Sequence, residues 1–120
     1  MSKILLITML VSILQPKEYL CRATWYDTSR HKKIYREHST AAVSNDLIRD
    51  LNIKVGKISK ETLFKGTLLI VTNNDNKKTD TVEITDVSGG GSRHIDLSLT
   101  SFEKISKKGV GIIKVSVRKI

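Results

Sequence analysis

The sequence contains a single cysteine, Cys21, in 120 residues. An intrachain disulfide is therefore excluded, and packing and hydrogen bonds must hold the fold together. Cys21 is a free thiol, an intermolecular partner, a lipid attachment point or a small buried hydrophobe. A chain of this length forms one domain and can bury an ordinary core without covalent cross-links.

Several motifs that carry chemistry are also missing. The sequence has no Cys/His spacing typical of a metal site, no phosphate-binding loop and no nucleophile elbow. Its three consecutive glycines, residues 89–91, do not open a helix in a βαβ unit, so they are not a dinucleotide-binding fingerprint. The histidines stand alone in the sequence. We therefore expect neither a metal nor another cofactor.

The apolar run at the N-terminus, from Ile4 to Leu14, is too short to span a membrane. Lys3 precedes it and Pro16 follows it, which is typical of a signal peptide. We predict a signal peptide in residues 1–18, a mature domain in residues 19–120 without a transmembrane span, and a location outside the cell or in the envelope. A native N-terminal strand or helix is the alternative, because no small-x-small cleavage triplet follows the run.

Basic residues exceed acidic ones throughout the chain. The 21 Lys and Arg residues face 12 Asp and Glu residues, which gives a net charge of +9, and both halves of the chain are basic. Such a surface favours anionic polymers, which include nucleic acid, wall polymers and membrane surfaces. With 39% hydrophobic and 28% charged residues, the composition argues against disorder.

Alternating and β-branched segments predict a mostly β protein. The expected strands are residues 19–26, 66–72, 79–85 and 110–120, with a loop at 27–36 and a hairpin turn at 73–78. A short helix is predicted after the N-cap residue Ser44, with Leu47, Ile48 and Leu51 on one face. A second is predicted over residues 98–107, capped by Ser98 or Thr100 and ended by Gly109. The regular spacing of strands favours a closed barrel, which has no free edges.

The segment TDVSGGGSRHIDLS places Asp86 and Asp96 on either side of the glycine run. Asp86 follows an alternating strand, and Asp96 lies between two apolar residues, so its side chain faces away from the core. Glycines tolerate positive φ, so the loop can fold back and bring the two carboxylates together. Two carboxylates on opposite sides of a sugar linkage are the requirement for glycoside cleavage. The alternative is that both carboxylates only cap turns and accept backbone hydrogen bonds.

The segments ATWYD, STAA, FKGTLLIVTN, TVEITD, HIDLS and KGVGIIKVSVRKI, in this order, resemble the rare lipoprotein A and expansin superfamily. The resemblance covers roughly residues 23–120. It implies a six-stranded double-psi β-barrel with two short helices and a polysaccharide-binding groove. It further implies that Asp96 acts as general acid and that Asp86 supports it. The residues implied to contact sugar are Thr40, Trp25, Tyr26, His94 and Ser88.

The predicted function follows from this resemblance. The chain is expected to be an exported monomer that binds cell-wall polysaccharide and acts on peptidoglycan like a lytic transglycosylase. The alternative is a non-catalytic, expansin-like module that binds or loosens the wall. The glutamate of the transglycosylases has no counterpart at its usual spacing, and Glu37 is the substitute nearby. Nucleic-acid binding is not expected, because the two aspartates would repel phosphate.

Overall fold

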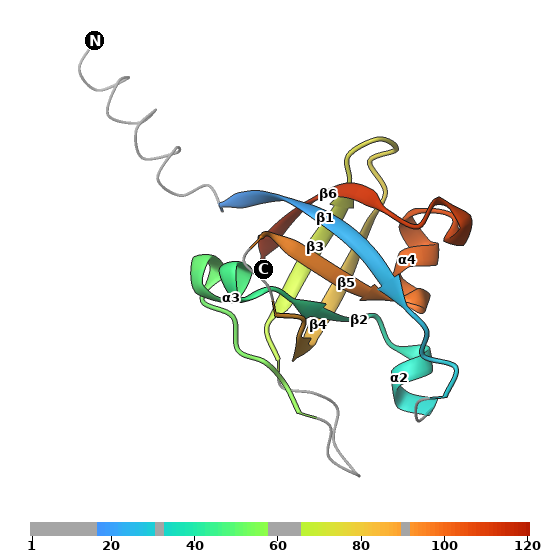
Figure 1. Cartoon of the computed structure of the whole chain (residues 1–120), viewed down its shortest axis with the longest axis horizontal. Helices are drawn as coiled ribbons and strands as arrows, with labels where there is room; N and C mark the ends of the chain where they lie inside the picture. The colour runs from blue at the N-terminus through green and yellow to red at the C-terminus, as the bar shows by residue number, and fades with distance from the viewer. Residues whose placement is uncertain (1–16, 31–32, 58–65, 90–91) are drawn as a thin grey trace, which may run out of the picture.

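The computed structural model describes residues 17–30, 33–57, 66–89 and 92–120. The predicted signal sequence as far as residue 16 lies outside these residues, as do His31, Gly90 and Gly91. Within the described part of the chain, six strands close into a barrel in the order β1-β5-β2-β4-β3-β6 (Figure 1). The predicted six-stranded, mostly β barrel is thereby confirmed.

The four predicted strand segments are all present, with ends shifted by up to three residues, and two further strands lie over residues 40–43 and 94–98. The strands are β1 (Glu18–Tyr26), β2 (Thr40–Val43), β3 (Leu68–Asn73), β4 (Thr79–Val87), β5 (His94–Ser98) and β6 (Ile113–Lys119). The helices are α2 (Lys33–Glu37), α3 (Asn45–Leu51), α4 (Leu99–Ile105) and the 3-10 turn η1 (Lys108–Val110). The two predicted helices are α3 and α4.

The barrel mixes parallel and antiparallel pairs. Strand β1 runs parallel to β5, and β2 runs parallel to β4; the other four pairs are antiparallel. Strands β3 and β4 form the predicted hairpin, whose turn places Lys77 at φ 64°. Strands β4 and β5 do not pair, because β2 lies between them. The segment that contains the glycine run is therefore a crossover and not a hairpin loop.

Strand alternation fills the barrel, since successive side chains point to opposite faces. The fully buried apolar side chains of the strands are Ala23, Ala41, Val43, Leu69, Val71, Val82, Ile84, Ile95, Leu97, Val115 and Val117. Helix α3 follows β2 and α4 follows the antiparallel β5, so the two helices lie at opposite ends of the barrel (Figure 1). Leu47 and Phe102 bury the inner faces of these helices.

Two local expectations were wrong. Helix α2 occupies part of the segment that was predicted to be a loop. Helix α4 ends at Ile105, and Gly109 lies in the separate turn η1. Ser44 is the N-cap residue of α3, as predicted, but its side chain makes no capping hydrogen bond. The hydroxyl of Ser44 accepts a hydrogen bond from the backbone of β5 instead.

Candidate functional site

Four neighbouring strands place three polar residues and one alanine in one row on the outside of the barrel. Thr24 of β1 lies opposite Asp96 of β5, Asp96 lies opposite Ala42 of β2, and Ala42 lies opposite Asp86 of β4. Directly opposed residues of a sheet share a face. We call the outer surface of β1, β5, β2 and β4 the four-strand face.

Asp96 is held in place within this row. The hydroxyl of Thr24 donates to Asp96 Oδ1 over 2.9 Å. Oγ1 of Thr24 also lies 2.9 Å from Nε2 of His94. A threonine hydroxyl has one hydrogen, and here the hydrogen points to the carboxylate. Nε2 of His94 must therefore carry the hydrogen of the second contact, and the order of donation is His94 to Thr24 to Asp96.

Asp86 reaches the row through a β-bulge. The pairing of β2 with β4 is interrupted, so that Ala41 lies opposite Ile84 but Ala42 lies opposite Asp86. Thr85 is the extra residue, and bulges of this kind re-aim the side chain that follows. The Asp86 side chain is exposed, and its Oδ1 accepts a hydrogen bond of 2.7 Å from the backbone N–H of Val87.

The two aspartates share a face but are not adjacent. Strand β2 separates them, and neighbouring strands lie about 4.8 Å apart, which sets their Cα atoms roughly 10 Å from each other. Between them the sheet presents only the methyl group of Ala42. The glycine run was expected to bring the two carboxylates together. It is instead the register of three strands that places them on one surface.

The predicted sugar-contacting residues other than Trp25 lie in the strands of the four-strand face or directly after them. Tyr26 and Thr40 lie one step along the four-strand face from the aspartates, and the Tyr26 hydroxyl is 2.7 Å from Thr40 Oγ1. Thr40 is 0% exposed, so its hydroxyl positions Tyr26. His94 is half-buried beside Thr24, and the exposed Ser88 follows β4, where its N–H donates to the carbonyl of Val43.

Trp25 lies apart from these residues. It follows Thr24 on β1 and therefore points to the opposite side of the strand, where it packs against the core. Its indole Nε1 donates to the carbonyl of Lys108 over 3.2 Å, and the ammonium of Lys108 lies 5.2 Å from the ring centroid. Trp25 thus joins β1 to η1, and no ring from this position lies on the four-strand face.

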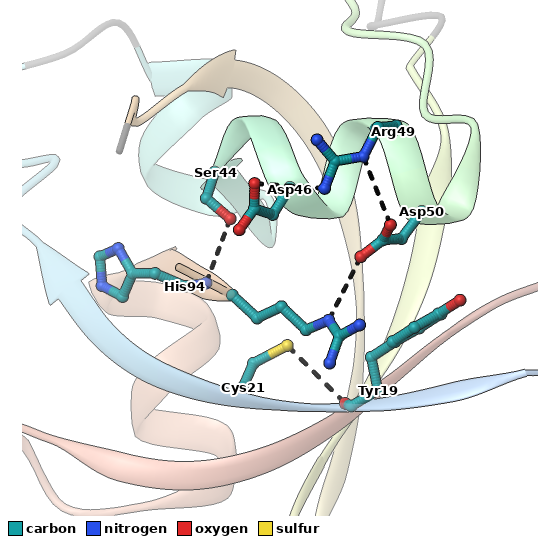
Figure 2. A network of polar contacts seen from close by, with 8 residues as sticks. Tyr19, Cys21, Ser44, Asp46, Arg49, Asp50 and His94 are labelled. Atoms are coloured by element: carbon teal, nitrogen blue, oxygen red, sulfur yellow. Dashed lines mark hydrogen bonds and ion pairs between the residues drawn. The ribbon is translucent and has the colours of Figure 1, made fainter. Parts of the chain in front are cut away.

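Side-chain and backbone contacts join the start of β5 to α3 and β1 (Figure 2). Arg93 Nε donates to Asp50 of α3 over 3.2 Å, and its guanidinium lies 4.6 Å from the ring centroid of Tyr19. The backbone N–H of His94 donates to the Ser44 hydroxyl, and the N–H of Ser44 donates to the His94 carbonyl. These contacts fix where His94 begins the strand that carries Asp96. Neither Arg93 nor Ser44 was predicted from the sequence to support the site.

Glu37 lies in a separate hollow with a volume of about 340 Å³. The hollow is lined by Glu37, His38, Ser39, Leu68, Asp80, Thr81, Glu83 and Lys104. Inside it the Lys104 ammonium donates to Ser39 Oγ over 3.0 Å, and Ser39 donates to Asp80. The substitute glutamate is therefore not part of the row that contains Asp86 and Asp96.

In the described part of the chain, no group of three His, Cys, Asp or Glu side chains is arranged to hold a metal ion. The same residues include no helix that is long and apolar enough to cross a membrane.

Comparison with known proteins identifies the architecture. No family model and no curated protein sequence matches the chain. The apo crystal structure of the Clavibacter michiganensis expansin superposes with a TM-score of 0.63 at 23% identity. A variant of that expansin in complex with cellohexaose gives 0.62 at 22%. Streptomyces papain inhibitor gives 0.60 at 16%. The chain has the double-psi β-barrel fold of expansins.

The extent of these similarities differs. Each alignment covers 87% of this chain. It covers 50% of the expansin and 94% of the papain inhibitor. The chain therefore spans about half the length of the expansin and almost the whole length of the inhibitor. The inhibitor shows that this barrel also occurs on its own.

Proposed function

We propose that this double-psi barrel is an exported, non-catalytic module that binds cell-wall glycan on its four-strand face. The hydrogen-bonded series of His94, Thr24 and Asp96 is the observation that carries the proposal. Sugars are recognised through their hydroxyl groups, and polar side chains fixed on rigid strands lose little entropy when they bind them. The shared fold of an expansin variant in complex with cellohexaose supports polysaccharide binding as the function. The signal peptide predicted for residues 1–18 would deliver the module to the wall.

The arrangement of the aspartates favours binding over cleavage. A glycosidase needs one carboxyl group that keeps its proton, through apolar surroundings or a close like charge, and a second on the other side of the bond. Asp86 is exposed at its strand, and β2 lies between it and Asp96. Asp96 accepts the hydroxyl hydrogen of Thr24. With β2 between their strands, the two carboxyl groups are not arranged as the closely spaced pair of a retaining glycosidase.

Pull-down with purified peptidoglycan sacculi and with cellulose tests the proposal. Thr24→Val keeps the shape of the side chain and removes both hydrogen bonds, and Asp96→Asn removes the charge. We expect either variant to weaken binding about tenfold, the loss typical of one charge-assisted hydrogen bond. Asp75→Asn is the matched control, because it makes the same charge change in the exposed hairpin turn. Wild-type binding by a folded Asp96→Asn variant would refute the site.

The products of the incubation separate binding from catalysis. We expect mass spectrometry to detect no anhydro-muropeptides and no new reducing ends after incubation with sacculi. Release of either product by the wild type, and its loss in Asp96→Asn, would establish a transglycosylase or a hydrolase instead. Retention by double-stranded DNA at moderate salt without retention by sacculi would indicate a nucleic-acid-binding protein.

A further inference from the structure

Two basic side chains face each other beside the four-strand face. The antiparallel pairing of β1 with β6, which lie side by side in Figure 1, places Arg22 directly opposite Lys114. On its other side Arg22 lies opposite His94 of β5. Arg22 precedes Thr24 by two residues on the same strand, so it points to the same side as Thr24. Lys114, Arg22 and His94 thus form a row next to the one that contains Asp96.

The charges of Arg22 and Lys114 are not compensated within the described part of the chain. Both side chains are exposed, and neither head group forms a hydrogen bond or an ion pair with a described residue. Like charges directly opposite each other on neighbouring strands repel and destabilise the sheet. The second outward pair along the same two strands shows the contrast, because Arg118 lies opposite Glu18 and forms an ion pair with it. No described carboxylate offsets the repulsion between Arg22 and Lys114, and a bound anion would relieve it.

A hollow lies at the same place. Its volume is about 450 Å³, and Leu20, Cys21, Arg22, Ile112, Ile113 and Lys114 line it. Leu20 is 70% exposed and Ile112 is 59% exposed, so two large apolar side chains flank the two cations. The cations of the hollow can therefore bind an oxyanion. Its apolar side chains can contact the rest of the molecule that bears this oxyanion. Arginine suits this role because its guanidinium binds an oxyanion through two parallel hydrogen bonds.

We propose that this hollow, the anion subsite formed by Leu20, Arg22, Ile112 and Lys114, binds an oxyanion carried by the wall polysaccharide. The inference rests on the proposed function and narrows its substrate to an acidic glycan. The neutral part of the glycan lies along Thr24 and Asp96, and a substituent bearing a carboxylate or phosphodiester reaches Arg22 and Lys114. The apolar side chains contact the face of the sugar ring.

The test compares two double variants with the same net charge. R22Q/K114Q removes the subsite cations, and K54Q/K78Q removes two exposed lysines elsewhere that have no described side-chain partner. Binding is measured to polygalacturonate, which carries carboxylates, to poly(glycerol phosphate), and to cellohexaose, which is neutral. We expect R22Q/K114Q to bind at least one of the acidic polymers about tenfold more weakly. We expect K54Q/K78Q to lose less than about threefold and cellohexaose binding to stay unchanged in both.

The outcomes separate this inference from the proposed function. The polymer on which R22Q/K114Q loses affinity identifies the oxyanion. Equal losses in the two double variants would overturn the subsite, because general charge would then explain the binding. The same tenfold loss on double-stranded DNA would also overturn it, since the site would not distinguish a glycan. If the wild type binds no glycan, the proposed function itself fails.

Discussion

Substitution of Gly66 tests whether the backbone before β3 packs as closely against Ile84 and Gly56 as the structure shows. Gly66 lies two residues before β3, and its N–H donates to Glu83 Oε2 over 3.2 Å. A Cβ at this position would overlap the carbonyl oxygen of Ile84 and would lie 2.8 Å from the backbone nitrogen of Gly56. These two backbone groups are hydrogen-bonded to each other over 2.8 Å. Neither can rotate away, so Gly66→Ala must displace the backbone or break the bond.

The expected cost follows from these contacts. Overpacking of a tight site costs about 1–3 kcal/mol, and the loss of one backbone hydrogen bond adds about 0.5–1.5 kcal/mol. Together they reduce the free energy of unfolding by about 2–4 kcal/mol, a large part of the roughly 5–15 kcal/mol typical of a domain. For a chain of this size the melting temperature should fall by about 10 °C.

Urea and thermal unfolding followed by the fluorescence of Trp25 measure this change. Gly109→Ala is the matched control, because nothing lies within 4 Å of a Cβ added at Gly109. We expect the control to unfold within about 0.5 kcal/mol of the wild type, as surface substitutions usually do. If Gly66→Ala also unfolded like the wild type, the close approach of Gly66 to Ile84 would be wrong.

Two further predictions concern buried polar groups. Burial raises the pKa of the Cys21 thiol to about 12. At pH 8 an aromatic disulfide reagent should therefore label the folded protein about 1,000-fold more slowly than the unfolded chain. The stability that the neutral thiol contributes is complete below about pH 9 and is lost as the pH rises toward 12. Asn73 donates to the carbonyl of Ile105 and is buried, so Asn73→Ala should cost about 1–3 kcal/mol in urea unfolding. Asn76 donates to the same carbonyl from an exposed position, so Asn76→Ala should also destabilise the protein, but less.

Strand alternation explains why the orientation of Asp96 could be predicted from the sequence. In HIDLS, Ile95 and Leu97 are buried and Asp96 faces outward, as the local pattern predicts. The same period predicts the inward residues Val82 and Ile84 of β4. Such predictions succeed because the period of a strand is set within a few residues and does not depend on its neighbours.

Contacts between distant segments could not be predicted in this way. The partner of Asp96 is Thr24, which lies 72 residues away in the sequence. The sequence predicts Ser44 as a helix N-cap, but its hydroxyl accepts a hydrogen bond from the backbone at the start of β5. Strand β2 is short and entirely buried, so it has no alternation by which to recognise it. Its position between β4 and β5 nevertheless decides how far apart the two aspartates lie.

The bulge in β4 shows which physical effect places Asp86. Strict alternation from the buried Val82 and Ile84 would turn Asp86 toward the core. An unpaired carboxylate there would cost far more than one irregular pair of residues. The extra residue, Thr85, shifts the register and puts Asp86 opposite Ala42 on the outer face. The cost of burying a charge therefore determines the position of Asp86.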